Sequence, residues 1–428
     1  MQGTRTPNEQ LRALLREATW SGAELAHAVN RLGAENGMRL NYSRASVGQW
    51  LAGTFPRRAT TPLILEALGR RLGRAVTAAE ASLAAAGAPA RPPYSLEVLA
   101  RIGPGAMSPP GLLPQVATAP GRLTHDHVRA ARDMLTVFSR GDRMWGGGYG
   151  RGALASYLRT FIGPALELPG GPVTRGALRA VAAELSYLCG FMNFDDGRQG
   201  AAQRYYLTAL RLADEAGRSE SRAITLRAMS VQAESLGHHA QARQLACAAL
   251  DASRPGLAPP EHTAFLLGQV GTAEAASGDR RAAFAALTRA EKLIERADSR
   301  RELPDVGTYH HASLTHQHAA IAARLGDHAA AISALEVSLR HRPPEERRSR
   351  AITLAQLARE QAAVGHLEAS CATWNAFCDA YPEVRSARAR RALETAYLAT
   401  RAFIANPQAR QVHGRVAELR AGRAPSKD

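Results

Sequence analysis

Near the amino terminus, the spacing of apolar positions predicts two short helices in succession. Ser21 and Ser43 stand where these helices would begin, because a serine hydroxyl can accept a hydrogen bond from a first-turn backbone N–H. Each serine is followed by apolar residues at helical spacing: Leu25, Ala26 and Val29 after the first, and Val47, Trp50 and Leu51 after the second. Gly53 and Pro56 predict the end of the second helix.

The second of these helices has a face suited to reading DNA. If Val47 and Trp50 pack inward, the opposite face carries a set of small and polar residues: Ser43, Arg44, Ala45, Ser46 and Gln49. Arg and Gln side chains can pair with guanine and adenine edges in the major groove. Arg57 and Arg58 follow the helix, where they would contact phosphates. The pattern therefore predicts a sequence-specific DNA-binding head.

The head resembles the lambda-repressor-like, xenobiotic-response-element class of helix-turn-helix domains over residues 8–86. The resemblance implies a first helix with Leu11, Leu14 and Leu15, and a fourth with Ile64, Leu65, Leu68 and Leu72. Between Ala26 and Ser43, the chain carries about ten residues more than the usual tight turn. Either the first helix of the pair is longer, or a loop intrudes near the DNA. The alternative function is a helical domain that has lost DNA binding and docks partners.

A second pattern recurs along the carboxy-terminal half, at intervals of 40, 41, 48 and 39 residues. Each repeat has a glycine after a helical stretch: Gly197, Gly237, Gly278, Gly326 and Gly365. Seven residues before each glycine stands a small residue: Gly190, Ser230, Gly271, Ala319 and Ala358. Small residues also stand five and twelve positions after the first four glycines: Ala202, Ala242, Ala283 and Ala331, then Ala209, Ala249, Ala290 and Ser338. In the fifth repeat we expect a shift of one residue, to Ala369 and Ala376.

This pattern predicts helix pairs that approach closely and stack on their neighbours. The repeat is similar to the tetratricopeptide repeat, although its intervals exceed that family's 34 residues. Such pairs form a curved α-solenoid, and projecting the repeat onto its concave side selects eight residues: Glu184, Tyr187, Phe191, Arg227, Glu234, Phe265, His316 and Arg359. This surface suits a peptide, small-molecule or protein signal, and Arg227 and Arg359 could hold carboxylates bidentately. The alternative is an unused, solvated face.

These patterns together predict an all-α chain in which a small helix-turn-helix bundle precedes an α-solenoid. The expected parts are a DNA-binding domain at 1–86, a Pro/Gly-rich linker at 87–122, a helical lead-in at 123–182 and tetratricopeptide-like repeats at 183–422. Proline blocks helix and lacks an N–H donor. We therefore expect a semi-extended linker that lets the head move relative to the repeats.

The head and the run from Ala183 to Ala213 together resemble an actinobacterial family of helix-turn-helix plus tetratricopeptide regulators associated with differentiation and secondary metabolism. The resemblance implies a cytoplasmic transcription regulator, associated with the nucleoid when bound to double-stranded DNA. We expect a homodimer whose heads read two half-sites. The competing interpretation is a tetratricopeptide interaction scaffold with a vestigial DNA-binding head.

Charge and composition agree with a nucleic-acid partner but do not locate its site. The formal net charge is +16 and the pI is near 10.5, which would draw the chain toward polyanions. Lys292 and Lys427 are the two lysines, and this preference for Arg is typical of a GC-rich genome. The cysteines are Cys189, Cys247, Cys371 and Cys378, and none forms a C-x-x-C motif, so we expect reduced, mostly buried thiols. We identify no secretory signal and no apolar run long enough for a membrane span.

Two further segments carry residues that invite chemistry. The glycine-rich run 146–152 lacks the preceding strand and the Gly-Lys-Ser/Thr ending of a phosphate loop, so we expect an interhelical turn. His310, His311, His316 and His318 lack accompanying Cys or carboxylate ligands at metal-site spacing, and we expect no metal. Nothing resembles a catalytic set. We therefore expect no cofactor and no enzymatic activity.

Overall fold

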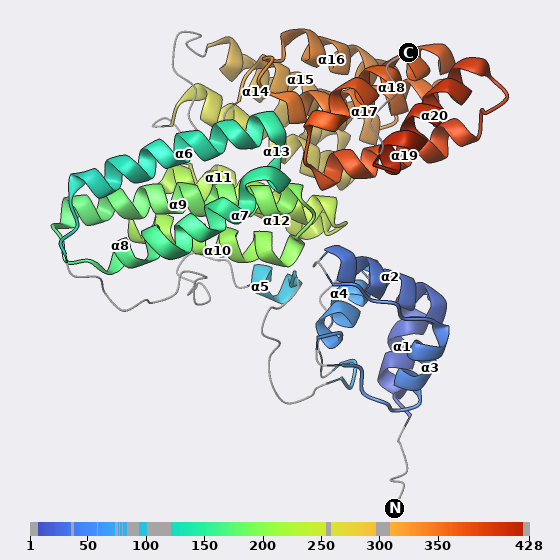
Figure 1. The fold of residues 1–428 in the computed structure, drawn as a ribbon, viewed down its shortest axis with the longest axis horizontal. Coiled ribbons are helices and arrows are strands. Elements are labelled where there is room, and N and C mark those ends of the chain that lie inside the picture. Colours follow the sequence, from blue (N-terminus) through green and yellow to red (C-terminus); the bar gives the residue numbers. More distant parts are fainter. Residues whose placement is uncertain are drawn as a thin grey trace, which may run out of the picture.

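The computed structural model describes residues 7–35, 38–57, 59–72, 76, 78, 80–83, 94–100, 121–253, 258–296 and 309–422. Across these ranges the chain forms helices and no β-strand (Figure 1), so the predicted all-α fold is confirmed. Within the same ranges, no helix combines the length and the apolarity that crossing a bilayer requires.

The amino-terminal head is a bundle of four helices: α1 (Glu9–Glu17), α2 (Gly22–Glu35), α3 (Arg44–Leu51) and α4 (Thr61–Leu72) (Figure 1). Its core contains the apolar residues that define the predicted first and fourth helices, with Leu11, Ile64 and Leu68 fully buried. Asn8 caps α1 by accepting a hydrogen bond from Leu11 N at 2.8 Å, and its amide donates to Ala81 O at 2.9 Å. The bundle is thereby tied to the chain that follows α4.

The carboxy-terminal part begins with four lead-in elements, namely α6 (His125–Trp145), α7 (Gly147–Tyr157), a π-helical turn (Leu158–Ile162) and α8 (Gly163–Glu167). Helical hairpins follow and stack on one another: α9 (Pro172–Asp195) with α10 (Gln199–Glu215), α11 (Ser219–Ser235) with α12 (His239–Ala252), α13 (Pro260–Ala276) with α14 (Arg280–Glu295), α15 (His311–Arg324) with α16 (His328–His341), α17 (Arg347–Ala363) with α18 (Leu367–Ala380), and α19 (Ala387–Arg401) with α20 (Pro407–Arg420). A single 3-10 turn (Tyr381–Glu383) joins α18 to the last hairpin.

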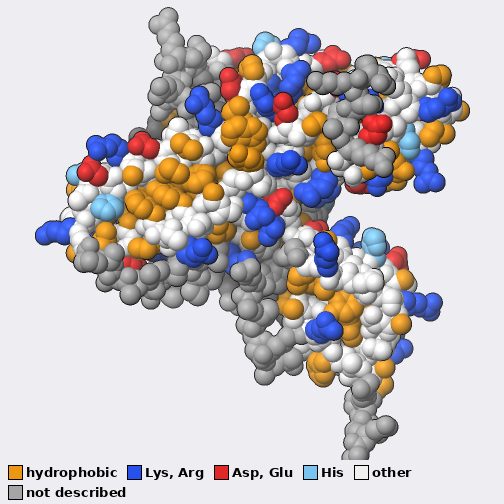
Figure 2. All heavy atoms as spheres, in the orientation of Figure 1, with side chains coloured by type: hydrophobic (Ala, Val, Ile, Leu, Met, Phe, Trp, Pro, Cys, Tyr) orange, Lys and Arg blue, Asp and Glu red, His pale blue; other side chains and the backbone are white. Residues whose placement is uncertain are grey.

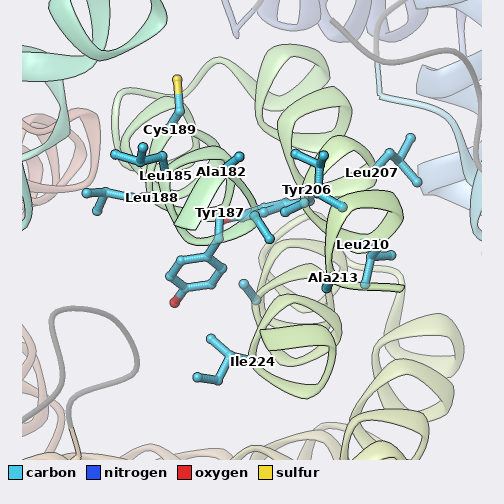
Figure 3. Close-up of a cluster of buried hydrophobic side chains, with 14 of the residues drawn as sticks. Ala182, Leu185, Tyr187, Leu188, Cys189, Tyr206, Leu207, Leu210, Ala213 and Ile224 are labelled. Atoms are coloured by element: carbon cyan, nitrogen blue, oxygen red, sulfur yellow. The ribbon is translucent and has the colours of Figure 1, made fainter. Parts of the chain in front are cut away.

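The repeat pattern has a direct structural cause. All five predicted turn glycines adopt the left-handed conformation, with φ between +78° and +88°. A Cβ atom on Gly190 would lie 2.6 Å from the ring of Tyr206, so glycine is what lets α9 approach α10 this closely. Figure 3 shows this contact region, where Tyr206 enters the space between the two helices. In the next hairpin, Ser230 Oγ donates to Ala242 O at 2.7 Å and links α11 to α12.

The expected shift in the fifth repeat is wrong. Ala369 and Ala376 are both exposed, whereas Ser370 and Phe377, at the unshifted positions, are buried. Ser370 Oγ donates to Ala358 O at 2.8 Å, which repeats the link between Ser230 and Ala242. The hydrogen bond from the serine hydroxyl therefore joins the same two repeat positions in both hairpins. At the next repeat position, the large residue Phe377 stands where the other repeats have a small one.

The solenoid curves until its two ends meet. Arg348 of α17 pairs with Asp142 of α6 at 2.5 Å, and both side chains are almost completely buried. Arg388 of α19 pairs at 2.8 Å with Asp195, the fully buried last residue of α9. Asp195 Oδ2 also accepts a hydrogen bond from Gly147 N at 3.0 Å, at the start of α7. The interhelical turn expected over 146–152 is therefore wrong for most of the run, because Gly146 alone separates α6 from α7 and residues 147–152 begin α7. The first helical N–H of α7 is occupied by a side chain of the protein.

The described part of the predicted linker lies on the solenoid instead of extending away from it. Helix α5 (Leu96–Ala100) and Tyr94 contribute buried side chains to the core cluster of α9 to α11. The side-chain amide of Gln203 bonds to both backbone groups of Ser95, with each distance 2.9 Å. Residues 94–100 therefore differ from the semi-extended chain expected from the prolines, because apolar side chains of this segment are buried against the solenoid.

The head contacts the solenoid through α4. His238, just before α12, places its Nε2 atom 3.4 Å from Oε1 of Glu66 in α4, and both side chains are buried. Tyr94 stacks on the His238 ring with the planes 5° apart and the centroids 5.6 Å apart. Arg70 completes the group by pairing with Glu66 at 2.8 Å and with Glu35 at 2.9 Å. In this structure the head is therefore docked.

Candidate functional site

Helix α3 is held in place by two side chains on its inner face. Val47 is fully buried and Trp50 is 5% exposed, both within the head's core. Gly22, the first residue of α2, lies so close to α3 that a Cβ atom there would be 3.3 Å from a methyl group of Val47. The start of α2 therefore packs directly on α3, which fixes the orientation of the outer face.

The predicted helix boundaries in this region are confirmed. Ser21 and Ser43 immediately precede α2 and α3. Ser21 N donates to Glu24 Oε2 at 2.6 Å, a bond that lowers the pKa of Glu24, and Ser43 N donates to Ser46 Oγ at 3.2 Å. At the other end of α3, Gly53 has φ +93°. Glu24 N also donates to Ser21 Oγ at 3.4 Å, so Ser21 caps α2 as its hydroxyl predicts, and Gly53 ends α3 as expected.

The additional residues between the two helices are used in two ways. Helix α2 continues to Glu35, so the first helix of the pair is indeed longer. The following connection is held to α2 by Asn30, whose amide donates to Tyr42 O and accepts from Tyr42 N, each at 2.8 Å. The Tyr42 ring then meets Trp50 edge-on at 5.0 Å between centroids, and its hydroxyl lies 2.7 Å from Thr60 Oγ1. The described part of this connection is therefore a support for α3.

The predicted DNA-reading residues lie on the outer side of the head. Ser43, Arg44, Ala45, Gln49 and Arg57 are exposed, and Ser46 is half-buried. Arg58 lies outside the described residues. On the face drawn in Figure 2, Lys and Arg side chains are scattered over the head and do not form one dense patch. The described residues of the predicted set therefore lie on α3 or near it in the sequence. The types of these residues distinguish the surface, because positive charge is not concentrated there.

Two further exposed residues flank α3 in the sequence and were not predicted. Arg39 lies in the connection before the helix, and Phe55, 61% exposed, lies just after it. Arg39, Arg44 and Arg57 form no ion pair with any described residue, so their charges are available to an outside partner. Arg39 stands five positions before Arg44, but the length of the connection gave no reason to select it from the sequence.

The concave side of the solenoid encloses a cavity of about 440 Å³. Its walls come from one face of α9, α11, α13, α15 and α17, with α6 and α19 at the sides. Six of the eight residues predicted for the concave side line it: Tyr187, Phe191, Arg227, Glu234, Phe265 and His316. Figure 3 shows Tyr187 extending from α9 on the side opposite to Cys189. The projection of the repeat therefore places most of the predicted residues on this surface.

The other two predicted residues lie elsewhere. Glu184, half-buried on α9, does not contribute to the cavity wall. Arg359 is exposed and lies beside His328, Trp374 and Ala399, in a shallow depression on the outside. Helix α19 packs on α17, and its Ala399 borders this depression, so this end of α17 faces a neighbouring helix and not the cavity.

Arginines outnumber carboxylates on the described walls of the cavity. The arginines are Arg143, Arg227, Arg324, Arg342, Arg348 and Arg388, and the carboxylates are Asp142, Glu234 and Glu346. The three carboxylates pair with Arg348, Arg324 and Arg342 at 2.5, 2.5 and 2.6 Å. Because each carboxylate already has an arginine partner, the cavity keeps an excess of positive charge.

Burial also sets the protonation of groups around the cavity. It lowers the pKa of His316 to about 3, with Arg342 and Arg388 acting in the same direction, so this ring is neutral. Its Nδ1 atom lies 3.1 Å from Thr353 Oγ1. Burial raises the pKa of the Tyr187 hydroxyl and lowers that of Arg227. The cavity thus combines neutral hydrogen-bonding groups with arginines.

The other histidines of the 310–318 cluster have separate partners. His310 Nε2 lies 2.8 Å from Glu346 Oε1, His311 meets the ring of His341 at 5.1 Å, and His318 lies 4.0 Å from Glu291. Within the ranges that the structure describes, no three His, Cys, Asp or Glu side chains are grouped to hold a metal. The four cysteines are free thiols, of which Cys247 is exposed and the others are buried.

Comparison with known families matches the head alone. The family model of the SP15 N-terminal domain covers residues 11–84, which span α1 to α4 and the apolar residues of the head's core. Comparison of the whole chain with curated proteins gave no match. The resemblance to helix-turn-helix and tetratricopeptide regulators thus remains a prediction from the residues quoted above.

Proposed function

We propose that this protein is a DNA-binding transcription regulator whose solenoid receives a signal. The observation that carries the proposal is the outer face of α3. There Arg44 and Gln49 are exposed on a helix anchored from behind by buried Val47 and Trp50. Side chains of these two types pair with purine edges in the major groove, and a short rigid helix is the usual element that presents them there.

The docking of the head supports the same proposal. Helix α3 lies on the side of the head away from the solenoid, whereas α4 contacts it (Figure 1). Residues of α2 and α4, and none of α3, border a second cavity of about 680 Å³ between the head and the solenoid. DNA could therefore reach α3 with the head docked. Arg39 and Arg57 beside α3 would contact phosphates, which fix the position of a recognition helix.

One helix connects the concave cavity to the head. Arg227 and Glu234 on α11 line the cavity, and His238, three residues beyond the end of this helix, contacts Glu66. If α11 can occupy two positions, a ligand that binds one of them more tightly would shift the equilibrium between docked and undocked heads. This connection supports control of transcription by a bound signal, through a change in how the heads are placed on DNA.

The proposal is tested by affinity selection of sheared genomic DNA on the full-length protein at about 150 mM salt, where nonspecific phosphate binding is weak. We expect an enriched motif, and for a homodimer two half-sites about 10 bp apart. The Arg44→Ala/Gln49→Ala double variant should lose the motif. As a control, Arg410→Ala/Gln411→Ala removes the same residue types from exposed positions of α20 and should retain it.

Two results would contradict the proposal. If both double variants enrich the same motif, α3 does not read the sequence. If the wild-type protein enriches no motif but retains a protein partner at high salt, the chain is an interaction scaffold with a vestigial head.

A further inference from the structure

Arg227 occupies an unusual position in the concave cavity. Its guanidinium carbon lies 3.6 Å from the centre of the Phe265 ring, and its Nε donates to Phe265 O at 3.4 Å. The charge of Glu234 raises the pKa of Arg227, but the Glu234 carboxylate is already bonded to Arg324 and Gln269. Arg227 consequently forms no ion pair with any described residue, although it lines the cavity.

The cavity also offers flat apolar surfaces next to arginines. Phe265 and Tyr309 pack with ring centroids 5.2 Å apart on the side of Arg227. On the α9 side, Tyr187 and Phe191 are nearly parallel, at 13° and 6.5 Å, and Arg348 lies 4.8 Å from the Phe191 centroid. A ligand between these walls would meet aromatic faces and guanidinium donors together.

We propose that the concave cavity binds a compact organic anion, with its carboxylate or phosphate on Arg227 and a planar apolar group against the neighbouring aromatic rings. A guanidinium with unused donors in a partly desolvated site favours a planar, bidentate oxyanion. A volume of about 440 Å³ is that of a metabolite site. The contact between α6 and α17 limits the length of an extended chain that could lie across the cavity. This inference specifies the signal class of the proposed function and rests on it.

The test is isothermal titration of the full-length protein, without DNA, with 1-naphthoate and with its neutral isostere 1-naphthamide. We expect one naphthoate per chain, and binding of naphthamide at least about tenfold weaker, because a hydrogen bond to a charged group contributes that much affinity. Arg227→Met should weaken naphthoate binding by about tenfold or more. Arg222→Met is the matched control, since Arg222 lies on the same helix but pairs with Asp214, outside the cavity lining. It should bind like wild type.

Several outcomes would overturn the inference. Equal affinity for naphthoate and naphthamide, or equal loss in the two variants, would show that Arg227 does not hold the anion. Absence of naphthoate binding at about 1 mM would exclude this ligand class. Tighter binding of a hexaglutamate peptide, sensitive to Arg227→Met, would instead identify an extended acidic segment as the occupant. The titration contains no DNA, so a negative result would overturn the proposed ligand class alone. The DNA selection tests the proposed function separately.

Discussion

Replacing Gly190 by alanine should destabilise the first helical hairpin. A Cβ atom there would lie 2.6 and 2.7 Å from two ring carbons of Tyr206, and 3.2 Å from Ala202 O. The Tyr206 ring is fully buried and the carbonyl belongs to the helix backbone, so neither can move aside easily. Overpacking of this kind costs about 1 to 3 kcal/mol. Alanine also has a higher helix propensity than glycine, by about 1 kcal/mol, which offsets part of this cost.

Gly176 in the same helix separates the two effects, because a Cβ atom there meets nothing within 4 Å. Gly176→Ala should gain the propensity without the overlap, so the difference between the two variants isolates a cost of about 1 to 3 kcal/mol. Urea titration followed by far-UV circular dichroism would measure it. If the two variants unfold at the same urea concentration, α9 and α10 do not approach at Gly190 and the small-residue explanation of the repeat is wrong.

Three further predictions concern charge. Arg57→Ala should weaken binding to all DNA sequences alike and reduce the salt slope by about one unit, and a loss confined to one sequence in salt-titrated binding would contradict the phosphate role. Arg348→Met should destabilise the closed solenoid by about 3 to 5 kcal/mol in urea titrations, because Asp142 would remain buried without its partner, and adding Asp142→Asn should recover most of this. The free energy of unfolding should fall as the pH drops from about 6.5 toward 3, because His316 takes up a proton in the unfolded chain but stays neutral in the folded protein. His316→Gln should flatten this dependence in thermal melts at a series of pH values. An unchanged slope would refute the buried neutral ring.

Local patterns in the sequence predict the helices and turns because their causes are local. The Ser21 hydroxyl accepts from Glu24 N within the first turn of α2, and Gly53 ends α3 with a positive φ, so residue types and local spacing suffice. The turn glycines and the small residues seven positions before them are also set within one hairpin. Apolar spacing and repeat periodicity therefore recover the all-α fold and place six of the eight predicted residues on the cavity wall.

The closure of the solenoid was not predicted, because it depends on its overall curvature. Asp142 and Arg348 are 206 positions apart. Asp142 lies in α6, before the first repeat, so no repeat offset relates the two residues. Glu66 and His238 are 172 positions apart and belong to different parts of the chain, so docking of the head was not foreseen. Arg359 follows the repeat offset that places Phe191 in the cavity, but it lies where α19 packs on α17. Contacts between elements far apart in the sequence therefore determine the closure of the solenoid and the docking of the head, which repeat periodicity does not specify.

The central claim is that α3 reads base edges in the major groove. Methylation interference on the enriched DNA tests it most directly, because methylation of guanine N7 blocks the position that an arginine would contact. We predict that methylation of a particular guanine prevents binding of the wild-type protein, and that Arg44→Ala loses this dependence while binding more weakly. If the interference pattern is the same for wild type and Arg44→Ala, Arg44 does not contact that base and the assignment of α3 as the recognition helix is contradicted.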